Sequence, residues 1–495
     1  MAVYQKNPAV VYTNYRIQSF SILTTNGQPI DLSAQAVNLS IFFDIFVSTS
    51  SGTITFIDGN DIIAGYVDRL TGSRASPICG LEDLIITFSV LVDNKEETFD
   101  KNYRINKVYN RSPSRNGASV YEIHFVSSPK IRSLTSKVNK SYKGIANHDI
   151  VAEICRDHLL IEDVEIDQTT GIYDHIIPNL RPLQAISWIA SKSYSSSPYS
   201  TSFFFFETVD GFKFKSLQNL YQQEPKYSNP YTFGSKLMND PTDDSRNPEF
   251  EILDFNFQEF DMQNAFVAGG ISSKMLAVDI FNQSTNVYEE SFDKNIGSSL
   301  NKNLPFYDPR SKWSEKYDTY FLTASEIKDQ STAVDNDVQY VLNRTQAMAM
   351  IRHYTMKFQV AGNWSLSPGD IIEIDYYRFK VPEHKATSIE KNNFRNGKFL
   401  VTAVNHTLRG KSMVTTVEVA SDSLASALSQ RQGGDAYGGG DVPPILGDEE
   451  MEALAPITIA EPNSIPVDIP TIPSDSVDIT GPADIPVTGI PDFGG

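Results

Sequence analysis

The sequence predicts a mainly β protein with a small α+β module in its middle and an extended C-terminal segment. Alternating apolar and polar residues recur along the first 430 residues, and this period of two is typical of half-buried strands. Helical patterns are few and gather mostly between residues 147 and 193. Residues 432–495 are rich in proline, glycine and acidic residues instead. A chain of 495 residues with 40% hydrophobic content suggests about three domains.

The expected strands fall into an early and a late group. The early group is 53–57, 84–91, 103–109 and 121–126, and the late group is 354–360, 372–376, 399–404 and 414–419. Turns are expected at Gly362-Asn363 and at Ser367-Pro368-Gly369. Between the groups, residues 203–206 are four phenylalanines, followed by Asp210-Gly211 and another apolar stretch. This pattern predicts a hairpin. We expect the Phe run to be a buried strand rather than an aromatic binding surface.

Four helices are expected. Asn147 can cap a helix that runs through Leu159, and Pro182 suits the first turn of a second helix. A third is expected at 338–352 and a short fourth at 423–430. The first two helices and the Phe hairpin together predict a compact α+β module.

A faint internal repeat links the two strand groups. The pattern Ile105-x-x-Val108-Tyr109 resembles Val401-x-x-Val404-Asn405, and an alternating strand follows each: 123–127 in the first copy and 417–421 in the second. The repeat predicts two copies of a similar β domain, although chance similarity is the alternative.

The C-terminal segment is unlike the rest of the chain. Residues 432–495 hold 12 acidic residues, no Lys or Arg, and 10 of the 26 prolines. Such a segment cannot offset its ordering entropy with a core of its own. A disordered acidic tail is one interpretation. The other is an extended arm that docks on a partner, favoured by regularly spaced Ile-Pro pairs. Their isoleucines are Ile465, Ile469, Ile472, Ile485 and Ile490.

Composition and motifs exclude several function classes. A net charge of −19 argues against a broad nucleic-acid footprint, and two cysteines, Cys79 and Cys155, cannot form a disulfide scaffold. We expect no secretion signal, no membrane span and no stable membrane binding. The seven histidines form no strong zinc spacing, and Cys155 with His158 is too little for a metal site. No nucleophile elbow, Walker loop or dinucleotide fingerprint occurs. We therefore expect no catalytic residue, metal or cofactor.

Three segments resemble the baseplate hub subunit of contractile-tailed, T-even-like phages. They are RTQAMA at 344–349, GNWSLSPGD at 362–370 and GKFLVTAVNH at 397–406. In that family a strand is followed by G-N-aromatic-x-L-x-P-G, another strand, and then a motif ending in V-x-H. The motif residues here are Gly362, Asn363, Trp364, Pro368, Gly369, Val404 and His406. The resemblance covers most of residues 20–430 and is strongest over the last 80 of these. The acidic segment departs from the simplest family members.

The resemblance implies a structural protein, not an enzyme. The family forms a homotrimer with two tail-tube-like β-barrel domains per chain, giving a pseudo-sixfold ring between the tail tube and the central spike. The implied domains are a first barrel at 1–130, an α+β module at 131–215, a second barrel at 216–430 with an insertion at about 293–340, and an arm at 431–495. No cofactor is implied.

The implied partners are the chain itself, a tail tube or tube-initiator protein, the spike and other baseplate proteins through the arm. DNA is only passing cargo, and the implied location is the virion baseplate after synthesis in the host bacterial cytoplasm. Two alternatives remain. A spike-base protein of a related injection machine would continue into its own spike helix. A sheet-rich hydrolase of cell-wall glycan would need two carboxylates facing each other in a cleft.

We expect structural roles for the motif residues. Pro368 and Gly369 should form a tight turn, and Gly362 and Asn363 tolerate left-handed backbone. Trp364 should pack either on the end of the barrel or on a neighbouring protomer. His406 should be a satisfied structural histidine rather than a pH switch.

Overall fold

The computed structural model describes most of the chain before residue 427. The described residues are 15–23, 27, 29–58, 78, 80, 82–92, 95–113, 119–196, 199–233, 250–259, 265, 267–279, 284–304, 319–324, 337–380, 388–391, 395–409 and 412–426. The chain divides between Ser429 and Gln430, and all described residues precede that division. The predicted arm at 431–495, with its five isoleucines, lies outside the described residues.

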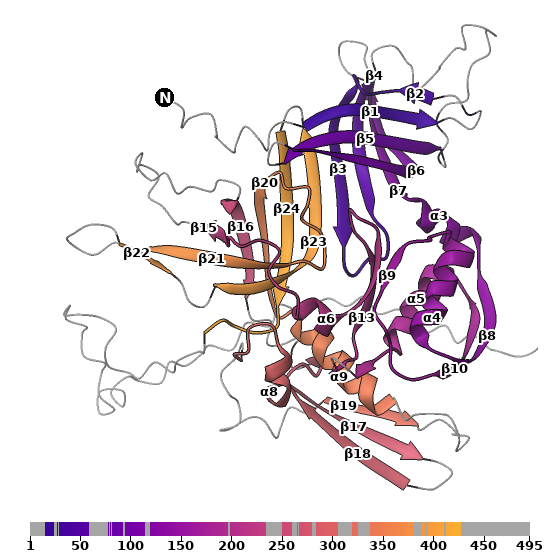
Figure 1. The fold of residues 1–495 in the computed structure, drawn as a ribbon, viewed down its shortest axis with the longest axis vertical. Coiled ribbons are helices and arrows are strands. Elements are labelled where there is room, and N and C mark those ends of the chain that lie inside the picture. The colour runs from indigo at the N-terminus through magenta and orange to yellow at the C-terminus, as the bar shows by residue number, and fades with distance from the viewer. Residues whose placement is uncertain are drawn as a thin grey trace, which may run out of the picture. The chain divides into compact units, whose positions relative to one another are not determined.

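The early strand group is confirmed and forms one side of a large sheet (Figure 1). Its strands are β1(Tyr15–Leu23), β2(Pro29–Asp31), β3(Ala36–Asp44), β4(Ser51–Asp58), β5(Asp83–Val92), β6(Lys95–Pro113) and β7(Ser119–Ser127). The alternation seen in the sequence follows the burial: in β7 every second side chain, from Ser119 to Ser127, is buried.

The late strand group is also confirmed and continues the same sheet. Its strands are β15(Tyr231–Phe233), β16(Ile252–Glu259), β20(Tyr354–Ala361), β21(Ile371–Lys380), β22(Ser388–Lys391), β23(Gly397–Arg409) and β24(Ser412–Ser421). The two groups join where β23 pairs with β3 in antiparallel register, so residues far apart in sequence share one ladder. Figure 1 shows the orange β23 beside the indigo β3.

The two groups have the same strand order, and we call them the first and second β units. When the short strands β2 and β22 are left out and the others are numbered along the chain, the order β3-β4-β7-β6-β5-β1 in the first unit matches β16-β20-β24-β23-β21-β15 in the second. Only the last pair differs, because β1 is antiparallel to β5 whereas β15 is parallel to β21. The mainly β class with two tandem units is confirmed.

The register of the strands matches between the units at two bulges, although the β6–β7 ladder has a further shift between Tyr109 and Ser112 that the β23–β24 ladder lacks. The β6–β7 ladder shifts between Ile105 and Lys107, and the β23–β24 ladder shifts between Val401 and Ala403. These are the positions that the faint repeat aligns. A second bulge lies between Ala36 and Asn38 in β3 and between Ile252 and Asp254 in β16. Because a bulge is a specific local feature, matched bulges confirm the internal repeat.

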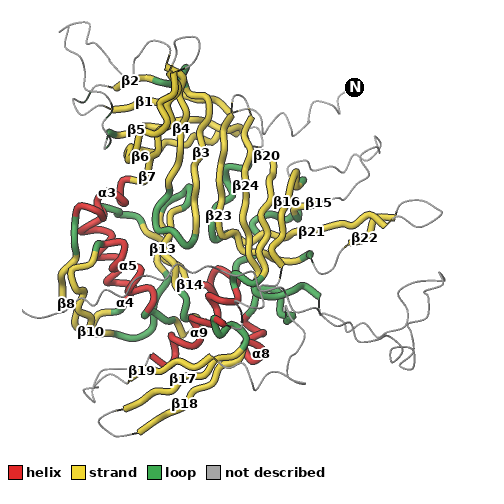
Figure 2. The backbone as a smooth tube through the Cα atoms, turned by 180° about the vertical axis from the view of Figure 1, so that it is seen from behind, coloured by secondary structure: helices red, strands yellow, loops and turns green. Residues whose placement is uncertain are grey.

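The α+β module lies between the two units in sequence. Its elements are α3(Ser128–Thr135), β8(Val138–Ile145), α4(Asn147–Ile154), the π-helical turn η2(Cys155–Leu159), β9(Val164–Ile166), β10(Tyr173–Leu180), α5(Pro182–Ser191), β11(Ser195–Ser196), β12(Tyr199–Ser200), β13(Phe203–Glu207), β14(Phe212–Ser216) and α6(Leu217–Tyr221). Figure 2 shows its helices α3, α4 and α5 in red beside the strands β8 and β10. Pro182 opens α5 as expected. The predicted capping role of Asn147 is wrong: Ala146 is the N-cap, and the Asn147 side chain instead donates to Ser193 Oγ at 3.1 Å.

The Phe hairpin is confirmed as buried on both faces. Phe203 and Phe205 pack in the core of the module, whereas Phe204 and Phe206 pack in a separate cluster with side chains of the second β unit. All four are at most 5% exposed. Strand β13 therefore joins two cores, which leaves no aromatic surface for a ligand.

The insertion in the second unit begins earlier than residue 293. A separate sheet of order β18-β17-β19 lies between β16 and β20 along the chain. It comprises β17(Ser272–Asp279), β18(Ser284–Ser291) and β19(Thr319–Ala324), with α8(Phe292–Asn295), η4(Ile296–Ser298) and α9(Asp337–Met350). The predicted start at 293 missed the β17–β18 hairpin. Helix α9, which was expected at 338–352, is confirmed.

The short helix expected at 423–430 is wrong for its described part. Residues 423–426 are not helical, and Leu424 instead forms a β-bridge with Asn303. The Asn303 amide also donates to the Leu424 carbonyl at 3.1 Å. Asn301 donates to the Ser423 carbonyl in the same way. Because these carbonyls are bound by the insertion, the segment stays extended.

Candidate functional site at the junction of the two β units

The motif loop, which we define as residues 362–370, connects β20 to β21 and contacts three hydrophobic clusters. Trp364 belongs to the core of the first β unit, and Leu366 belongs to the core of the second. Gly369 lies against Phe206 in the cluster that joins the module to the second unit. The loop therefore joins all three parts of the described structure.

Trp364 enters the first β unit from the second. Its ring centroid lies 4.8 Å from that of Phe88 and 4.6 Å from that of Phe99, in edge-to-face geometry. The ring of His406, on β23, packs against another side of the indole, with the two ring centroids 4.4 Å apart. Trp364 is only 4% exposed in a single chain. Of the two packing modes expected, the one within the chain is therefore the one seen, and the side chain has little surface left for a neighbouring protomer.

Residues 367–370 form the tight turn that the sequence predicts. The Asp370 amide donates to the Ser367 carbonyl at 3.3 Å, and Gly369 has a φ of +89°. Proline followed by a residue with positive φ is typical of a type II turn. A Cβ on Gly369 would also lie 3.0 Å from the Phe206 ring. Gly369 thus serves both the turn and the approach of β13.

Gly362 and Asn363 do not use the left-handed region that the sequence analysis allowed for them. Among the described residues, neither has a positive φ. Gly362 is needed for space instead, because a Cβ there would lie 2.5 Å from the Met413 side chain. The Asn363 amide donates to Thr415 Oγ1 at 2.9 Å, so the turn is attached to β24 by hydrogen bonds.

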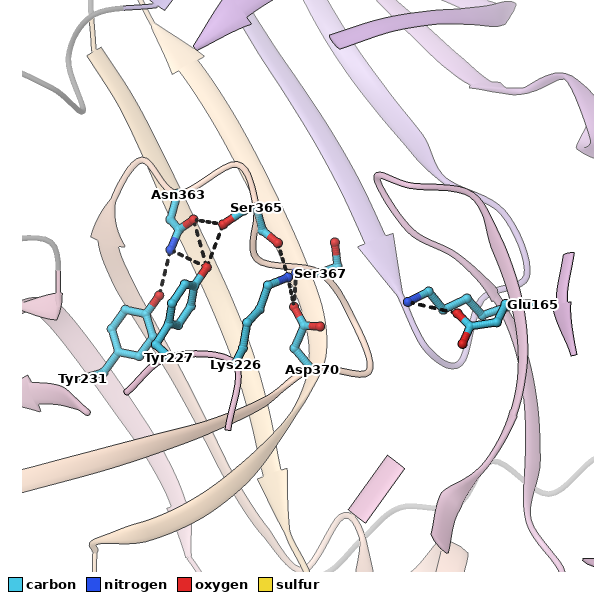
Figure 3. Close-up of polar contacts among 9 residues, drawn as sticks. Glu165, Lys226, Tyr227, Tyr231, Asn363, Ser365, Ser367 and Asp370 are labelled. Atoms are coloured by element: carbon cyan, nitrogen blue, oxygen red, sulfur yellow. Dashed lines mark hydrogen bonds and ion pairs between the residues drawn. The ribbon is translucent and has the colours of Figure 1, made fainter. Parts of the chain in front are cut away.

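A polar network holds the open side of the motif loop (Figure 3). The Asn363 side-chain amide donates to the hydroxyls of Tyr227 and Tyr231, each at 3.0 Å. Tyr227 and Ser365 share a hydrogen bond of 2.7 Å between their hydroxyls. The two tyrosines come from the segment that enters the second unit, so they bind the start of that unit to its motif loop. Sequence reasoning missed them because nothing local distinguishes them.

Lys226 and Asp370 form the charged part of this network. The ammonium of Lys226 lies 2.7 Å from Asp370 Oδ2 and also donates to the Ser365 carbonyl. Burial raises the pKa of Asp370 above its ordinary value, although the Lys226 charge acts in the opposite direction. The pair is arranged to fix the turn, since the Ser367 amide donates to the same carboxylate oxygen at 2.8 Å.

The ladder between β23 and β3 is the main backbone connection between the units. It runs from the Ala403–Asp44 pair to the Arg409–Asn38 pair. On its more open face, the Ser40 hydroxyl donates to Asn405 Oδ1 at 2.7 Å. On its core face, the motif residue Val404 is fully buried opposite Phe43. The ladder therefore has both a packed and a polar side.

His406 is buried in this ladder. Its Nδ1 lies 3.2 Å from Thr415 Oγ1, and its ring packs against Trp364 and Phe43. Burial lowers the pKa of His406 to about 3, so the ring is neutral at physiological pH. This agrees with a structural histidine rather than a pH switch, although the buried Nε2 has no hydrogen-bond partner of normal geometry among the described residues, so the ring is not fully satisfied as expected.

A buried ion pair connects the module to the first unit, and sequence reasoning did not find it. Glu207, at the end of β13, pairs with Lys101 of β6. Its other oxygen accepts from the Ser50 amide and hydroxyl, each at 2.8 Å. Glu207 is 1% exposed, so loss of either partner would leave a buried charge without compensation.

A cavity of about 820 Å³ lies beside the same junction. Asp44 and Glu418 both line it, on the two strands that flank β23, and both lie opposite Ala403. Their backbones are therefore about two strand spacings, or roughly 10 Å, apart. Arg344 and Arg352 line the same cavity. Burial raises the pKa of Asp44.

Among the described residues, no cluster of three or more His, Cys, Asp or Glu side chains could hold a metal ion. Burial raises the pKa of Cys155 to about 12, so the thiolate that a metal would need is unfavourable. No helix within the described ranges has the length and apolar character to cross a membrane.

Replacing Trp364 tests whether it holds the units together. We expect Trp364→Ala to lower the free energy of unfolding by about 3–5 kcal/mol, because it leaves a cavity in the first unit. Trp364→Phe keeps a ring against Phe88 and Phe99, so its free energy of unfolding should fall by roughly half as much as that of the alanine variant. Chemical denaturation measures both. Equal stability of the wild type and the alanine variant would contradict the packing role.

Acidification tests the buried state of His406. Because its folded pKa is about 3, the unfolded chain takes up a proton more readily. The stability from this group is complete above pH 6.5 and falls as the pH drops toward 3. Between pH 7 and pH 5 the loss should be about 2 kcal/mol. His406→Phe keeps a ring beside Trp364 but cannot take up a proton. Its free energy of unfolding should therefore fall less than that of the wild type between pH 7 and pH 5, by this amount, as chemical denaturation at each pH would measure. An equal fall in both proteins would refute this.

The comparisons agree with the resemblance found in the sequence. The probable baseplate hub protein gp334 of Vibrio phage KVP40 is 20% identical over 426 residues, which cover 82% of this chain and 95% of that protein. A search of protein-family models gives no match.

A solved tail-protein structure has a similar fold. The 43 kDa tail protein of prophage MuSo2 from Shewanella oneidensis aligns with a TM-score of 0.50 at 8% identity, over 83% of this chain and 99% of that one. A tail protein from Neisseria meningitidis MC58 aligns over 84% of this chain and 100% of that one, with a TM-score of 0.46 and 12% identity. The MuSo2 alignment confirms the fold, and the similarity to the KVP40 protein confirms that this chain resembles a baseplate hub protein of phages.

Proposed function

We propose that this chain is the central hub of a contractile phage baseplate. Three copies form a ring of six similar β units, which joins a hexameric tail tube to a trimeric spike and leaves a channel for DNA. The observation that supports this most strongly is the pair of β units with the same strand order and the same bulge positions. The similarity to a probable hub protein supports the location in the baseplate.

The duplication suits a part that connects two symmetries. A sixfold tube needs six equivalent contacts, whereas a threefold spike needs three. Three chains with two similar units each present six related faces on one side. The units are not identical, because the second carries the β17–β19 insertion, so the other side can be threefold. One chain then serves both partners. The acidic composition also suits a DNA channel, since like charges reduce sticking to the wall.

The alternatives make different predictions. A spike-base protein of a related injection machine would share the ring but carry its own spike. A glycan hydrolase would place its acids in the cavity that holds Asp44 and Glu418, where a paired carboxylate is available. The two arginines in that cavity favour a structural charge cluster instead.

The native mass of the purified chain tests the ring. We expect a trimer, near three times 55.2 kDa, either alone or in a three-to-three complex with its spike protein. Light scattering coupled to size exclusion measures this. A chain that stays monomeric with the spike present would overturn the hub, and the Asp44–Glu418 cavity would then be assayed for glycan cleavage.

Deletion of residues 432–495 tests the arm. The arm is proposed to lie along a neighbouring baseplate protein, with isoleucines such as Ile465 and Ile485 in contact with it. The truncated chain should keep the native mass of the full chain but join fewer baseplates in an assembly reaction. A second variant, with the five isoleucines changed to serine, keeps the length of the segment and removes only its apolar side chains. Unchanged assembly of both would show that the segment is only a solubilising tail.

A further inference from the structure

Strand β23 changes partner along its length, and this connects the two β units. Residues from Gly397 to Leu400 pair with β21 of the same unit. After the shift at Val401, residues from Ala403 to Arg409 pair with β3 of the other unit. One edge of β23 thus serves its own unit first and the neighbouring unit afterwards.

Strand β6 is the counterpart of β23 and repeats only the first half of this arrangement. Its pairing with β5 ends at Arg104, which corresponds to Leu400 in the repeat. Beyond Lys107, β6 pairs with β7 on one side and with no other described strand on the opposite side. In β23 this edge pairs with β3. The corresponding edge of β6 therefore has no described strand partner.

Strand β16 is the counterpart of β3 and shows the complementary edge. Both strands pair with the next strand of their unit through a ladder with a bulge at the same place. The other edge of β3 holds β23, whereas β16 has β20 as its one strand partner among the described residues, apart from a single bridge at Glu251. Within the part of the chain that the structure describes, one edge of each kind is therefore without a strand partner.

We propose that β6 of one copy pairs with β16 of a second copy, in the antiparallel register that β23 and β3 use within the chain. The number of copies in the closed assembly rests on the proposed hub function, whereas the pairing rests on the repeat. Such a contact is heterologous, so it forms either a closed ring or an open filament. It would also cover two strand edges that otherwise invite uncontrolled association.

The repeat fixes the β6 side of the register. Because the ladder shifts align Ile105 with Val401, Val108 corresponds to Val404 and Tyr109 to Asn405. Tyr109 is 51% exposed and contacts Lys107 and His124 of its own sheet, so part of its ring is open to a second copy.

The matched bulges fix the β16 side. They align Asn38 with Asp254, so Phe43 corresponds to Glu259 and Phe42 to Gln258. Within the chain, Asn405 lies opposite Phe42. Between copies, Tyr109 therefore lies opposite Gln258, and Val108 lies opposite Glu259. Leu253, the bulged residue of β16, is 59% exposed and lies near the end of the same edge.

Cysteine cross-linking tests the register in the full-length chain. Tyr109→Cys and Gln258→Cys are combined in a Cys79→Ser background, which leaves only the buried native Cys155. Mild oxidation should join different chains, and non-reducing gels should show bands up to a trimer. The control pair, Tyr109→Cys with Asn256→Cys, is two residues out of register and should cross-link at least fivefold less. The pair Phe42→Cys with Asn405→Cys is the positive control, because these residues lie opposite each other within one chain. Its disulfide is measured as a loss of free thiols.

The outcomes separate this inference from the hub proposal. The chain could be a trimer by native mass but lack the Tyr109–Gln258 cross-link, or the shifted pair could cross-link equally well. Either result overturns the strand pairing, whereas the proposed hub function stands. Bands that continue beyond three chains support the pairing but contradict closure at three. A monomer in the presence of the spike, with no cross-link, overturns both. A ladder that ends at three, specific to the predicted pair, supports both.

Discussion

The packing of Trp364 into the core of the first β unit is the contact on which the arrangement of the described structure depends. It comes from a loop of the second unit, so burying it fixes the position of that loop. The same loop places Leu366 in the second core and Gly369 against Phe206 of the module. An indole ring buries much apolar area and prefers defined edge contacts, so Trp364 fixes the orientation of the two units together with the β23–β3 ladder.

The β23·β3 ladder adds direction to this packing. A single bulge near residue 402 lets one strand serve its own unit and then the next, without a separate linking element. The same bulge recurs in β6, which is the basis for the proposed contact with another copy. Among the described residues, the duplicated unit has one joined edge and two edges without a strand partner, which is the arrangement that the proposed ring would use.

Polar groups buried at the junction serve geometry rather than chemistry. His406 is held neutral by burial, and Glu207 is compensated by Lys101 and Ser50. Removing one partner of such a buried pair lowers the free energy of unfolding by more than the interaction contributes, because the remaining polar group is then buried with neither a partner nor water. These groups therefore disfavour other packings of the three parts. The polar network around Asn363 acts in the same way on the open side of the motif loop.

The sequence by itself determined the strands, the Phe hairpin, the turn at Pro368-Gly369 and the repeat, because each depends on local periodicity or on residues with restricted backbone. It also led to the hub family through the motif at 362–370. The tertiary structure alone decided that Trp364 packs within its own chain, that Gly362 makes room for Met413, that Asn147 bonds to Ser193, and where the insertion begins. These depend on contacts between residues far apart in sequence, and such contacts leave no periodic trace in the segments that make them.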